Sequence, residues 1–348
     1  MRVAHWGIWA PNKSGMFHTT DDLCRGEQEL GIDAAIIDAL SPEAKTTGRY
    51  SCVGHEYADA ADIYCLHLTI PQPYYSDGTP TVVVLHGNPL YSMQLELYHL
   101  EPDNPSPFST VLELFKRSTP TWYVSFWEEE QGAYWDALDG VRDKPRIRYL
   151  PRGIVFGDQW TPEGDKAQLE GDPVIVIADQ FRLFKDALPV LWGAYHYWLR
   201  NPRARIYLYA LPPAGSQTRT TLDRWIQHGQ IHRCIGGMSD IVDYLPSVFR
   251  RADVLVSTVT GESRVALEAQ GCGTAVVAPW PGADVELGRF WQPEEVATAI
   301  EQAVATGISA QARRERADRT RARYDIRPCV EGMKLLFEEI MDHGATGG

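Results

Sequence analysis

The stretch from Thr260 to Ala278 reads TGESRVALEAQGCGTAVVA and follows the short apolar run Val254–Val256. This pattern predicts a strand, a tight turn, a short helix and a second strand. Gly261 gives the turn its conformational freedom, and the hydroxyl of Ser263 can cap the helix. The first N–H groups of such a helix face the turn and carry a positive partial charge, so they are suited to binding phosphate.

The composition bounds the class of protein. A chain of 348 residues, 44% of them hydrophobic and 23% charged, is typical of a globular protein with two domains. No apolar run approaches the roughly 20 residues that a membrane span needs, and Met1–Gly7 reads as a strand rather than a signal peptide. Six scattered cysteines without a Cys-x-x-Cys pair indicate reduced thiols of a cytoplasmic protein rather than zinc ligands or disulfides. A net charge of −13 argues against a nucleic acid partner.

Apolar runs alternate with helical patterns in both halves of the chain, which predicts an α/β protein with parallel sheets. The expected strands are Val3–Trp9, Ala34–Asp38, Ile63–His67, Thr81–His86, Thr121–Ser125, Arg146–Leu150, Val174–Ala178, Arg205–Tyr209, Ile231–Cys234, Val254–Ser257 and Ala275–Ala278. The expected helices are His18–Gly31, Ser106–Arg117, Asp186–Arg200, Arg219–His228, Ile241–Arg250 and Ser263–Gly271, with three more between Pro293 and His343. The Pro-rich, aromatic segment Asn88–Pro107 is expected to be an active-site or acceptor loop.

The stretch from Thr260 to Ala278 resembles the nucleotide-sugar site of glycosyltransferase family 4. That family has a Glu, a turn with Gly, a short helix with a second Glu, and then Ala and Gly before an apolar strand. The His86-Gly87 pair, the loop before Lys185 and the Arg146–Gly153 hinge extend the resemblance over nearly the whole chain.

The resemblance implies the GT-B fold, in which two Rossmann-like domains with parallel sheets face each other across a cleft. Residues 1–150 would form the acceptor-side domain and residues 151–325 the donor domain. Residues 326–348 would form a helix that crosses back to the first domain. The implied activity is transfer of a sugar from a nucleoside-diphosphate donor, UDP- or GDP-linked, with retention at the anomeric carbon and no further cofactor.

In the first domain, the resemblance assigns Gly15 and His86 to the site. Gly15 lies in the loop Ala10–Thr20, near the donor phosphates and the acceptor, and His86 lies beside the sugar as a catalytic residue. His67, at the end of the preceding strand, is a less specific candidate. The alternatives are an ordinary capped turn and histidines that are hydrogen-bonded at strand ends.

In the second domain, Lys185 matches a family lysine that binds the donor diphosphate. The family arginine falls on Gln180, which is a departure, and Arg182 is near enough to take its place. The alternative for both cations is an ordinary surface position.

The turn and helix that follow Thr260 supply the rest of the donor site. Glu268 would bind the ribose hydroxyls, or else it is a helix-surface carboxylate. The residues Gly261, Ser263, Arg264 and Val265 would bind the donor at the start of the helix. The family's first Glu falls on Thr260, a second departure, and Glu262 could reach the same space as a catalytic residue. The chain has no Asp-x-Asp pair, which favours a metal-independent transferase.

Two further features have structural alternatives. The aromatic run from Trp122 to Trp135 can stack on sugars, but large aromatic side chains are more often part of a core. The arginines between Arg313 and Arg327 are interleaved with acidic residues and are expected to form a solvated helix face. Contact of this stretch with anionic lipid or with nucleic acid is the alternative.

Three other functions fit the same pattern. The chain could be a nucleotide-sugar binder with little or no activity, because Thr260 and Gln180 depart from the family. It could also be a sugar-nucleotide epimerase of similar fold, or a transferase that modifies nucleic acid. The acceptor is not specified by any motif: a sugar, a lipid-linked sugar, a small molecule and, less favoured, a nucleic acid remain open, as does peripheral contact with an anionic membrane.

Overall fold

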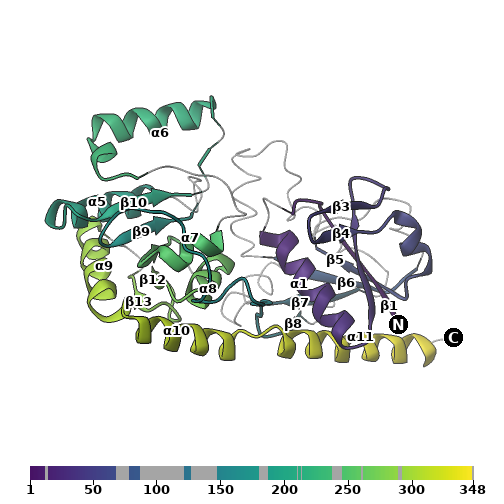
Figure 1. Cartoon of the computed structure of the whole chain (residues 1–348). Coiled ribbons are helices and arrows are strands. Elements are labelled where there is room, and N and C mark those ends of the chain that lie inside the picture. The colour runs from purple at the N-terminus through teal and green to yellow at the C-terminus, as the bar shows by residue number, and fades with distance from the viewer. Residues whose placement is uncertain are drawn as a thin grey trace. The chain divides into compact units, whose positions relative to one another are not determined.

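The computed structural model consists of two compact units (Figure 1). Unit 1 comprises Met1–Val155 together with Tyr324–Gly348, and unit 2 comprises Phe156–Arg323. The described residues are 1–11, 15–67, 78–86, 121–126, 147–179, 187–209, 211–212, 214–236, 245–259, 262–288 and 292–346.

Unit 1 is built on a six-stranded sheet in which all neighbouring strands are parallel. In the order of the sheet the strands are β2 (Asp33–Asp38), β1 (Arg2–Gly7), β5 (Ile63–Leu66), β6 (Thr81–Leu85), β7 (Thr121–Ser125) and β8 (Ile147–Tyr149). A small antiparallel hairpin of β3 (Lys45–Thr47) and β4 (Tyr50–Cys52) follows β2. The six strands of the sheet lie where the alternation of apolar runs predicted them, whereas the hairpin was not predicted.

Two helices cover one face of this sheet: α1 (Gly15–Glu29) and α11 (Arg327–Thr346). Their apolar side chains share one core with alternate residues of the strands, namely Val3, Leu23, Ile63, Val82, Val330, Met333 and Phe337. The helices approach closely at Gly26, where a Cβ atom would lie only 2.7 Å from Cγ1 of Val330. The other face packs Trp6 and Tyr64 beside the 3₁₀ helix η1 (His55–Ala60).

Unit 2 has a five-stranded parallel sheet. Its order is β10 (Arg205–Leu208), β9 (Val174–Ile177), β11 (Val254–Val256), β12 (Ala275–Ala278) and β13 (Val285–Glu286). The surrounding helices are α5 (Leu188–Arg200), α6 (Gln217–His228), α7 (Leu245–Arg251), α8 (Arg264–Gly271), α9 (Pro293–Gly307) and α10 (Ala310–Arg323). The helices α5 and α9 pack at Gly193, where a Cβ atom would lie 2.3 Å from that of Val296.

One predicted strand is wrong. The segment Ile231–Cys234 forms a 3₁₀ turn, η3 (Ile231–Arg233), and an isolated bridge between Ile206 and Ile235 follows it in place of a strand. Gln230 has a left-handed backbone (φ 57°), which reverses the chain directly after α6. The buried side chains of Ile231 and Cys234 are three residues apart, the spacing of one 3₁₀ turn rather than the alternation of a strand.

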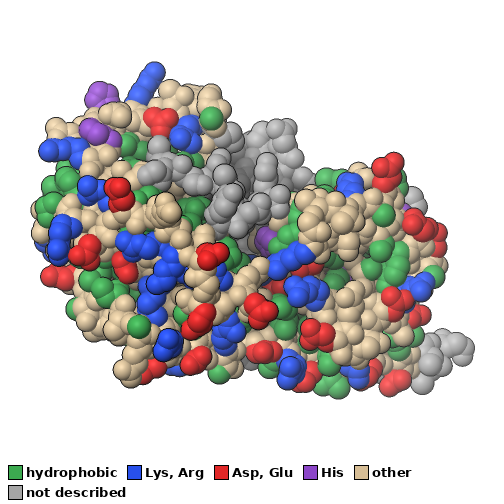
Figure 2. All heavy atoms as spheres, viewed as in Figure 1, with side chains coloured by type: hydrophobic (Ala, Val, Ile, Leu, Met, Phe, Trp, Pro, Cys, Tyr) green, Lys and Arg blue, Asp and Glu red, His purple; other side chains and the backbone are tan. Residues whose placement is uncertain are grey.

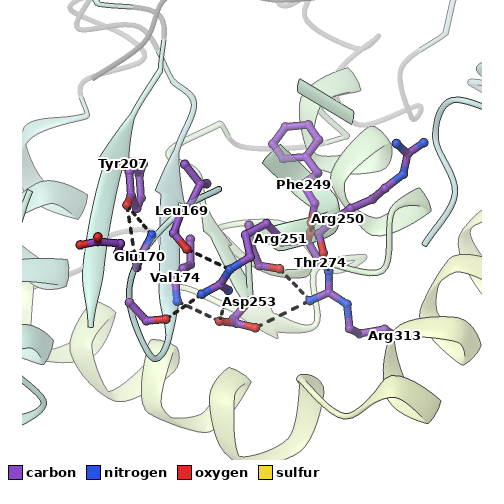
Figure 3. A network of polar contacts seen from close by, with 12 residues as sticks. Leu169, Glu170, Val174, Tyr207, Phe249, Arg250, Arg251, Asp253, Thr274 and Arg313 are labelled. Atoms are coloured by element: carbon purple, nitrogen blue, oxygen red, sulfur yellow. Dashed lines mark hydrogen bonds and ion pairs between the residues drawn. The ribbon is translucent and has the colours of Figure 1, made fainter. Parts of the chain in front are cut away.

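The expectation that the arginines of α10 form a solvated face is also wrong for part of the helix. Arg313 donates to the carbonyls of Ala252 (2.7 Å) and Arg250 (2.7 Å), and it lies 3.8 Å from Asp253 (Figure 3). Arg316 is buried and donates to Asp284 (2.7 Å). Because buried donors need acceptors, these guanidinium groups are held by the protein itself.

Figure 3 shows how this network closes the amino-terminal edge of the sheet. Asp253 precedes β11 and accepts from the N–H of Val174, the first residue of β9 (2.8 Å). Arg251 lies 3.4 Å from the same carboxylate and donates to the carbonyls of Leu169 and Gly171. The arginines of this edge therefore have a structural role.

Two further observations concern the described residues. None of their helices combines the length and the apolar character that crossing a membrane requires. All six cysteines are buried free thiols. The expected helix Ser106–Arg117 and the loop Asn88–Pro107 lie outside the described residues.

Candidate functional site

In unit 2, the strand order reverses at β9, with β10 on one side and β11, β12 and β13 on the other. The loops after β9 and β11 therefore leave the same sheet edge at a topological switch point, where open parallel sheets bind their ligands. The two loops are joined by hydrogen bonds. Asp179, two residues after β9, accepts from the N–H of Thr258 (2.5 Å) and from its hydroxyl (3.3 Å).

Asp179 was not singled out from the sequence as a site residue. The signal that could have found it is a buried carboxylate directly after an apolar strand. Its bond to Thr258 fixes the residues directly after β11 relative to the end of β9.

The helix α8 begins as the sequence predicts. Ser263 has an extended backbone (φ −85°, ψ 139°), and its hydroxyl accepts from the N–H of Ala266 (3.1 Å). This cap satisfies one of the free N–H groups of the first turn and leaves the positive end of the helix at the carboxyl edge of the sheet.

Glu268 and Arg264 lie one turn apart on α8 and form an ion pair. The Arg264 Nε–H donates to Oε1 of Glu268 at 2.7 Å, and their side chains are only 8% and 6% exposed. The guanidinium neutralises and orients a carboxylate that would be unfavourable alone in the interior. Glu268 is thus a positioned carboxylate rather than a helix-surface one, and Arg264 is bound to it within the helix.

The other predicted donor residues divide into two groups. Glu262 and Val265 lie partly buried at the start of α8. The remaining positions, Thr260, Gly261, Gln180, Arg182 and Lys185, lie outside the described residues, so their roles stay predictions.

In unit 1, Gly15 is the first residue of α1, and a Cβ atom added there would meet no atom of the described residues within 4 Å. The described part of the chain therefore gives no packing reason for a glycine at this position. Its role near a ligand stays a prediction.

The predicted His86 lies at the end of a row of buried polar side chains in unit 1. His67 Nδ1 lies 2.8 Å from His86 Nε2, and His67 Nε2 lies 3.0 Å from Nδ1 of His5. The row ends at Glu27, whose Oε2 lies 2.8 Å from Nε2 of His5. The three histidines belong to the adjacent strands β1, β5 and β6 or directly follow them, and Glu27 comes from α1.

Sequence reasoning named His86 and His67 but missed His5 and Glu27. In the sequence, His5 is one residue within the first strand. The sequence did contain a signal for His5 and Glu27. A histidine inside an apolar strand and a glutamate on the buried side of a helix both need hydrogen-bond partners. The pairing itself depends on the strand order, which places β1 beside β5.

The surroundings of the three histidines raise the pKa of one and lower the pKa of the other two. Burial opposes a charge on His5, but Cys24 and the Glu27 carboxylate favour it, and the pKa of His5 is raised well above its usual value. Burial and the neighbouring His86 hold the pKa of His67 well below its usual value. Burial and the charge of Arg152 lower the pKa of His86 to about 3. At neutral pH the row therefore carries its positive charge on His5.

Donor atoms of His5, Cys65 and His67 lie within 4.8 Å of one another, close enough to raise the question of a metal. The two histidine nitrogens, however, are 3.0 Å apart, a hydrogen-bond distance, whereas nitrogens around a tetrahedral zinc lie about 3.3 Å apart. Burial also raises the pKa of the Cys65 thiol, which keeps it protonated. The arrangement is that of a hydrogen-bonded row.

Comparison with known proteins gives a likeness of structure. No family model matches the sequence, and no curated protein matches it. A sucrose-phosphate synthase from Thermosynechococcus elongatus superposes with a TM-score of 0.70 at 13% identity, over 98% of this chain and 99% of that chain. The trehalose-6-phosphate synthase OtsA also has a TM-score of 0.70 at 13% identity, over 97% of this chain and 99% of that one.

A third solved structure, HepE from Anabaena in complex with UDP-glucose, has a TM-score of 0.65 at 14% identity, over 99% of this chain and 100% of that chain. At such identities the likeness is one of fold. Each unit carries its own parallel sheet with helices, and the chain has the GT-B fold.

Proposed function

We propose that the chain is a glycosyltransferase that moves a sugar from a UDP- or GDP-linked donor to an acceptor. The observation that carries this proposal is the capped start of α8 at the switch point of the unit 2 sheet, where Asp179 joins the two loops. The fold supports it, because HepE binds UDP-glucose and a pneumococcal O-GlcNAc transferase of similar fold was solved with UDP and GlcNAc.

In sugar transfer, the departing diphosphate is the group that the protein most needs to stabilise. Negative charge grows on it as the bond to the sugar breaks, and preorganised positive groups lower the energy of that state. In this proposal Lys185, Arg182 and the start of α8 at Ser263 supply the positive charge. The paired Glu268 binds the ribose, because Arg264 holds its carboxylate in one orientation.

The finer parts of the proposal follow from the resemblance. Transfer proceeds with retention and without a metal, since Lys185, Arg182 and the helix start can neutralise the diphosphate. His86 and Gly15 contact the sugar, and Glu262 takes the place of the glutamate that is missing at Thr260. A nucleic acid acceptor is disfavoured by the net charge of −13, and Figure 2 shows acidic and basic side chains interspersed over the visible face.

A thermal-shift panel of nucleotide sugars, with free nucleoside diphosphates alongside, tests the donor site. A ligand present at a hundred times its Kd raises the free energy of unfolding by about 2.7 kcal/mol, so the correct donor raises Tm. We expect Glu268→Gln and Lys185→Ala to abolish this shift. The exposed positions Glu286 and Lys166 provide the matched controls Glu286→Gln and Lys166→Ala, which should keep it. If no nucleotide sugar or diphosphate shifts the unmodified chain at millimolar concentration, the proposal is wrong.

A nucleotide-sugar binder without transferase activity is the second candidate. Two sequence observations favour it, because Gln180 and Thr260 replace residues that contact the donor in the resembled family. Incubation of the stabilising donor with the chain separates the two candidates. Release of free sugar or nucleoside diphosphate indicates a transferase, and an intact donor after long incubation with a panel of acceptors indicates a binder.

A further inference from the structure

The row from Glu27 to His86 runs from the interior of unit 1 to the carboxyl edge of its sheet. Glu27 and His5 are fully buried, His67 is 3% exposed, and His86 is partly exposed. The three nitrogen and oxygen separations of 2.8, 3.0 and 2.8 Å form one continuous line of hydrogen bonds. Each histidine uses one ring nitrogen toward each neighbour.

We propose that this row is a proton wire, in which Glu27 and His5 hold a proton inside unit 1 and His67 relays it to His86. The wire stands on the geometry of unit 1, and only the use of its proton in sugar transfer rests on the proposed function. In this proposal Glu27, His5 and His67 are positioning residues, whereas His86 would meet the ligand.

The directions of the hydrogen bonds follow from where the charge lies. Oε2 of Glu27 accepts from His5, and Oε1 has no hydrogen-bond partner in the described part of the chain, so this buried carboxylate depends on a cation beside it. His5 therefore carries both ring protons: Nε2–H donates to Glu27, and Nδ1–H donates to Nε2 of His67. His67 then has its proton on Nδ1 and donates to Nε2 of His86, whose own proton is on Nδ1.

The relay moves two protons within the row and releases one. When the Nδ1 proton of His86 passes to a basic oxygen of a ligand or of water, the Nδ1 proton of His67 moves to Nε2 of His86. The Nδ1 proton of His5 moves to Nε2 of His67. No other bond changes, and the row loses one positive charge. All three histidines end neutral with the proton on Nε2, and a proton from water restores the first state by the reverse steps.

The other titratable groups that face the row keep the positive charge at its buried end. They are Cys24 on α1, Cys65 on β5, Cys329 on α11 and Arg152 after β8. Burial raises the pKa of the Cys24 thiol to about 11 and raises that of Cys329 as well, so these thiols are neutral. The guanidinium of Arg152 disfavours a second cation on His86.

Packing alone does not explain the row. His5 lies on the face of β1 that α1 and α11 cover, where its neighbours Val3, Leu23 and Val330 form an apolar core. When apolar side chains of similar volume replace a buried ion pair, the stability of a protein is often unchanged or higher. Four buried or half-buried polar groups in one line are therefore more consistent with a role in proton transfer.

Histidine nitrogen NMR of the full chain tests the wire. In the unmodified chain we expect scalar couplings through the N–H···N bonds from His5 to His67 and from His67 to His86, with the proton of His86 on Nδ1. Glu27→Gln keeps an acceptor for His5 but removes the charge that holds its second proton. His5 then becomes neutral and keeps its Nε2 proton toward residue 27, the two N–H···N bonds of the row reverse, and the proton of His86 moves to Nε2.

The exposed Glu29 on the same helix gives the matched control, because Glu29→Gln removes the same charge and should leave the tautomer of His86 unchanged. Absence of the two couplings in the unmodified chain overturns the proposal even if Glu27→Gln does not fold. An unchanged His86 tautomer in folded Glu27→Gln also overturns it. The proposal is also overturned if the chain binds one equivalent of metal and removal of the metal alters the His5 and His67 signals. The metal would then occupy the nitrogens that the relay needs.

Kinetics separate the wire from the proposed function. If the chain transfers sugar, Glu27→Gln should lower kcat by about a hundredfold, the lower end of the range for a positioned proton transfer, with KM unchanged and the pH profile shifted. Glu29→Gln should keep the activity of the unmodified chain. A chain that binds no nucleotide sugar contradicts the proposed function and leaves the NMR test intact.

Discussion

Three serines in unit 2 make the same hydrogen bond at the start of a helix: Ser263, Ser216 and Ser309. The hydroxyl of Ser263 accepts from the N–H of Ala266 on α8, and that of Ser216 accepts from the N–H of Arg219 on α6, each at 3.1 Å. Only Ser263 lies on the loop that Asp179 joins to the end of β9. Comparison of Ser263 with Ser216 therefore separates the contribution of a helix cap to folding from its contribution to ligand binding.

We expect Ser263→Ala and Ser216→Ala each to lower the free energy of unfolding by about 1 kcal/mol, because each loses one cap. Only Ser263→Ala should also weaken binding of the nucleoside diphosphate that stabilises the unmodified chain, because the start of α8 would then be less ordered. Urea unfolding and titration calorimetry measure the two effects. Equal affinities for the diphosphate in both variants would argue against a phosphate site at α8.

The residues that sequence reasoning could and could not find differ in a physical way. Ser263 and Glu268 belong to one short motif, so their spacing along the chain already indicates a cap and a carboxylate about one and a half helix turns further on. His5 and His67 are far apart in the sequence and meet only because β1 and β5 pair. A pattern along one strand cannot reveal which strand lies beside it, and so the row in unit 1 needed the structure.

At the scale of elements, α10 shows how charge along a helix can be misread. Seven arginines between positions 313 and 327 predict a solvent-exposed helix face. The side chain of Arg313, however, is only 11% exposed, whereas that of Arg314 is 71% exposed. The helix lies against the amino-terminal ends of β9 and β11 through the Asp253 network (Figure 3). Its position in the fold, rather than its composition, decides which arginines are buried.

We expect Arg313→Met to lower the free energy of unfolding by about 3 kcal/mol, because the carbonyls of Ala252 and Arg250 lose their donor and Asp253 loses a cation. The neighbouring substitution Arg314→Met should change it by less than about 0.5 kcal/mol. Denaturant unfolding of both variants makes the comparison. A similar loss of stability in the two would contradict a structural role for Arg313.

At the scale of the whole molecule, unit 1 is assembled from two parts of the chain that are far apart in sequence. Its sheet comes from the first part, and α11 from the second part supplies Val330, Met333, Phe337 and Ile340 to the core. Unit 2 is the continuous segment between them and has its own core, centred on residues of β9, α5 and α9. Loss of α11 packing should therefore act on unit 1.

We expect Phe337→Ala to destabilise unit 1 by about 3–5 kcal/mol, the range for truncating a buried Phe. Leu335 lies on the same helix with 64% exposure, so Leu335→Ala should have little effect. Hydrogen exchange measured peptide by peptide should show faster exchange in β1, β5 and β6 and unchanged exchange in β9, β11 and β12. An equal loss of protection in the two units would show that they unfold as one.

The contribution of α11 to unit 1 also has a consequence for synthesis on the ribosome. The strands of unit 1 are translated first, but the helix that completes their core emerges only after all of unit 2 has been made. Domains are generally expected to fold in the order in which they are synthesised. We expect the opposite order of folding in this chain. Unit 2 can fold as soon as it leaves the exit tunnel, whereas the strands of unit 1 keep their apolar surface exposed until α11 has been made. We therefore expect chaperones that shield nascent polypeptides to bind this part of the chain during that interval.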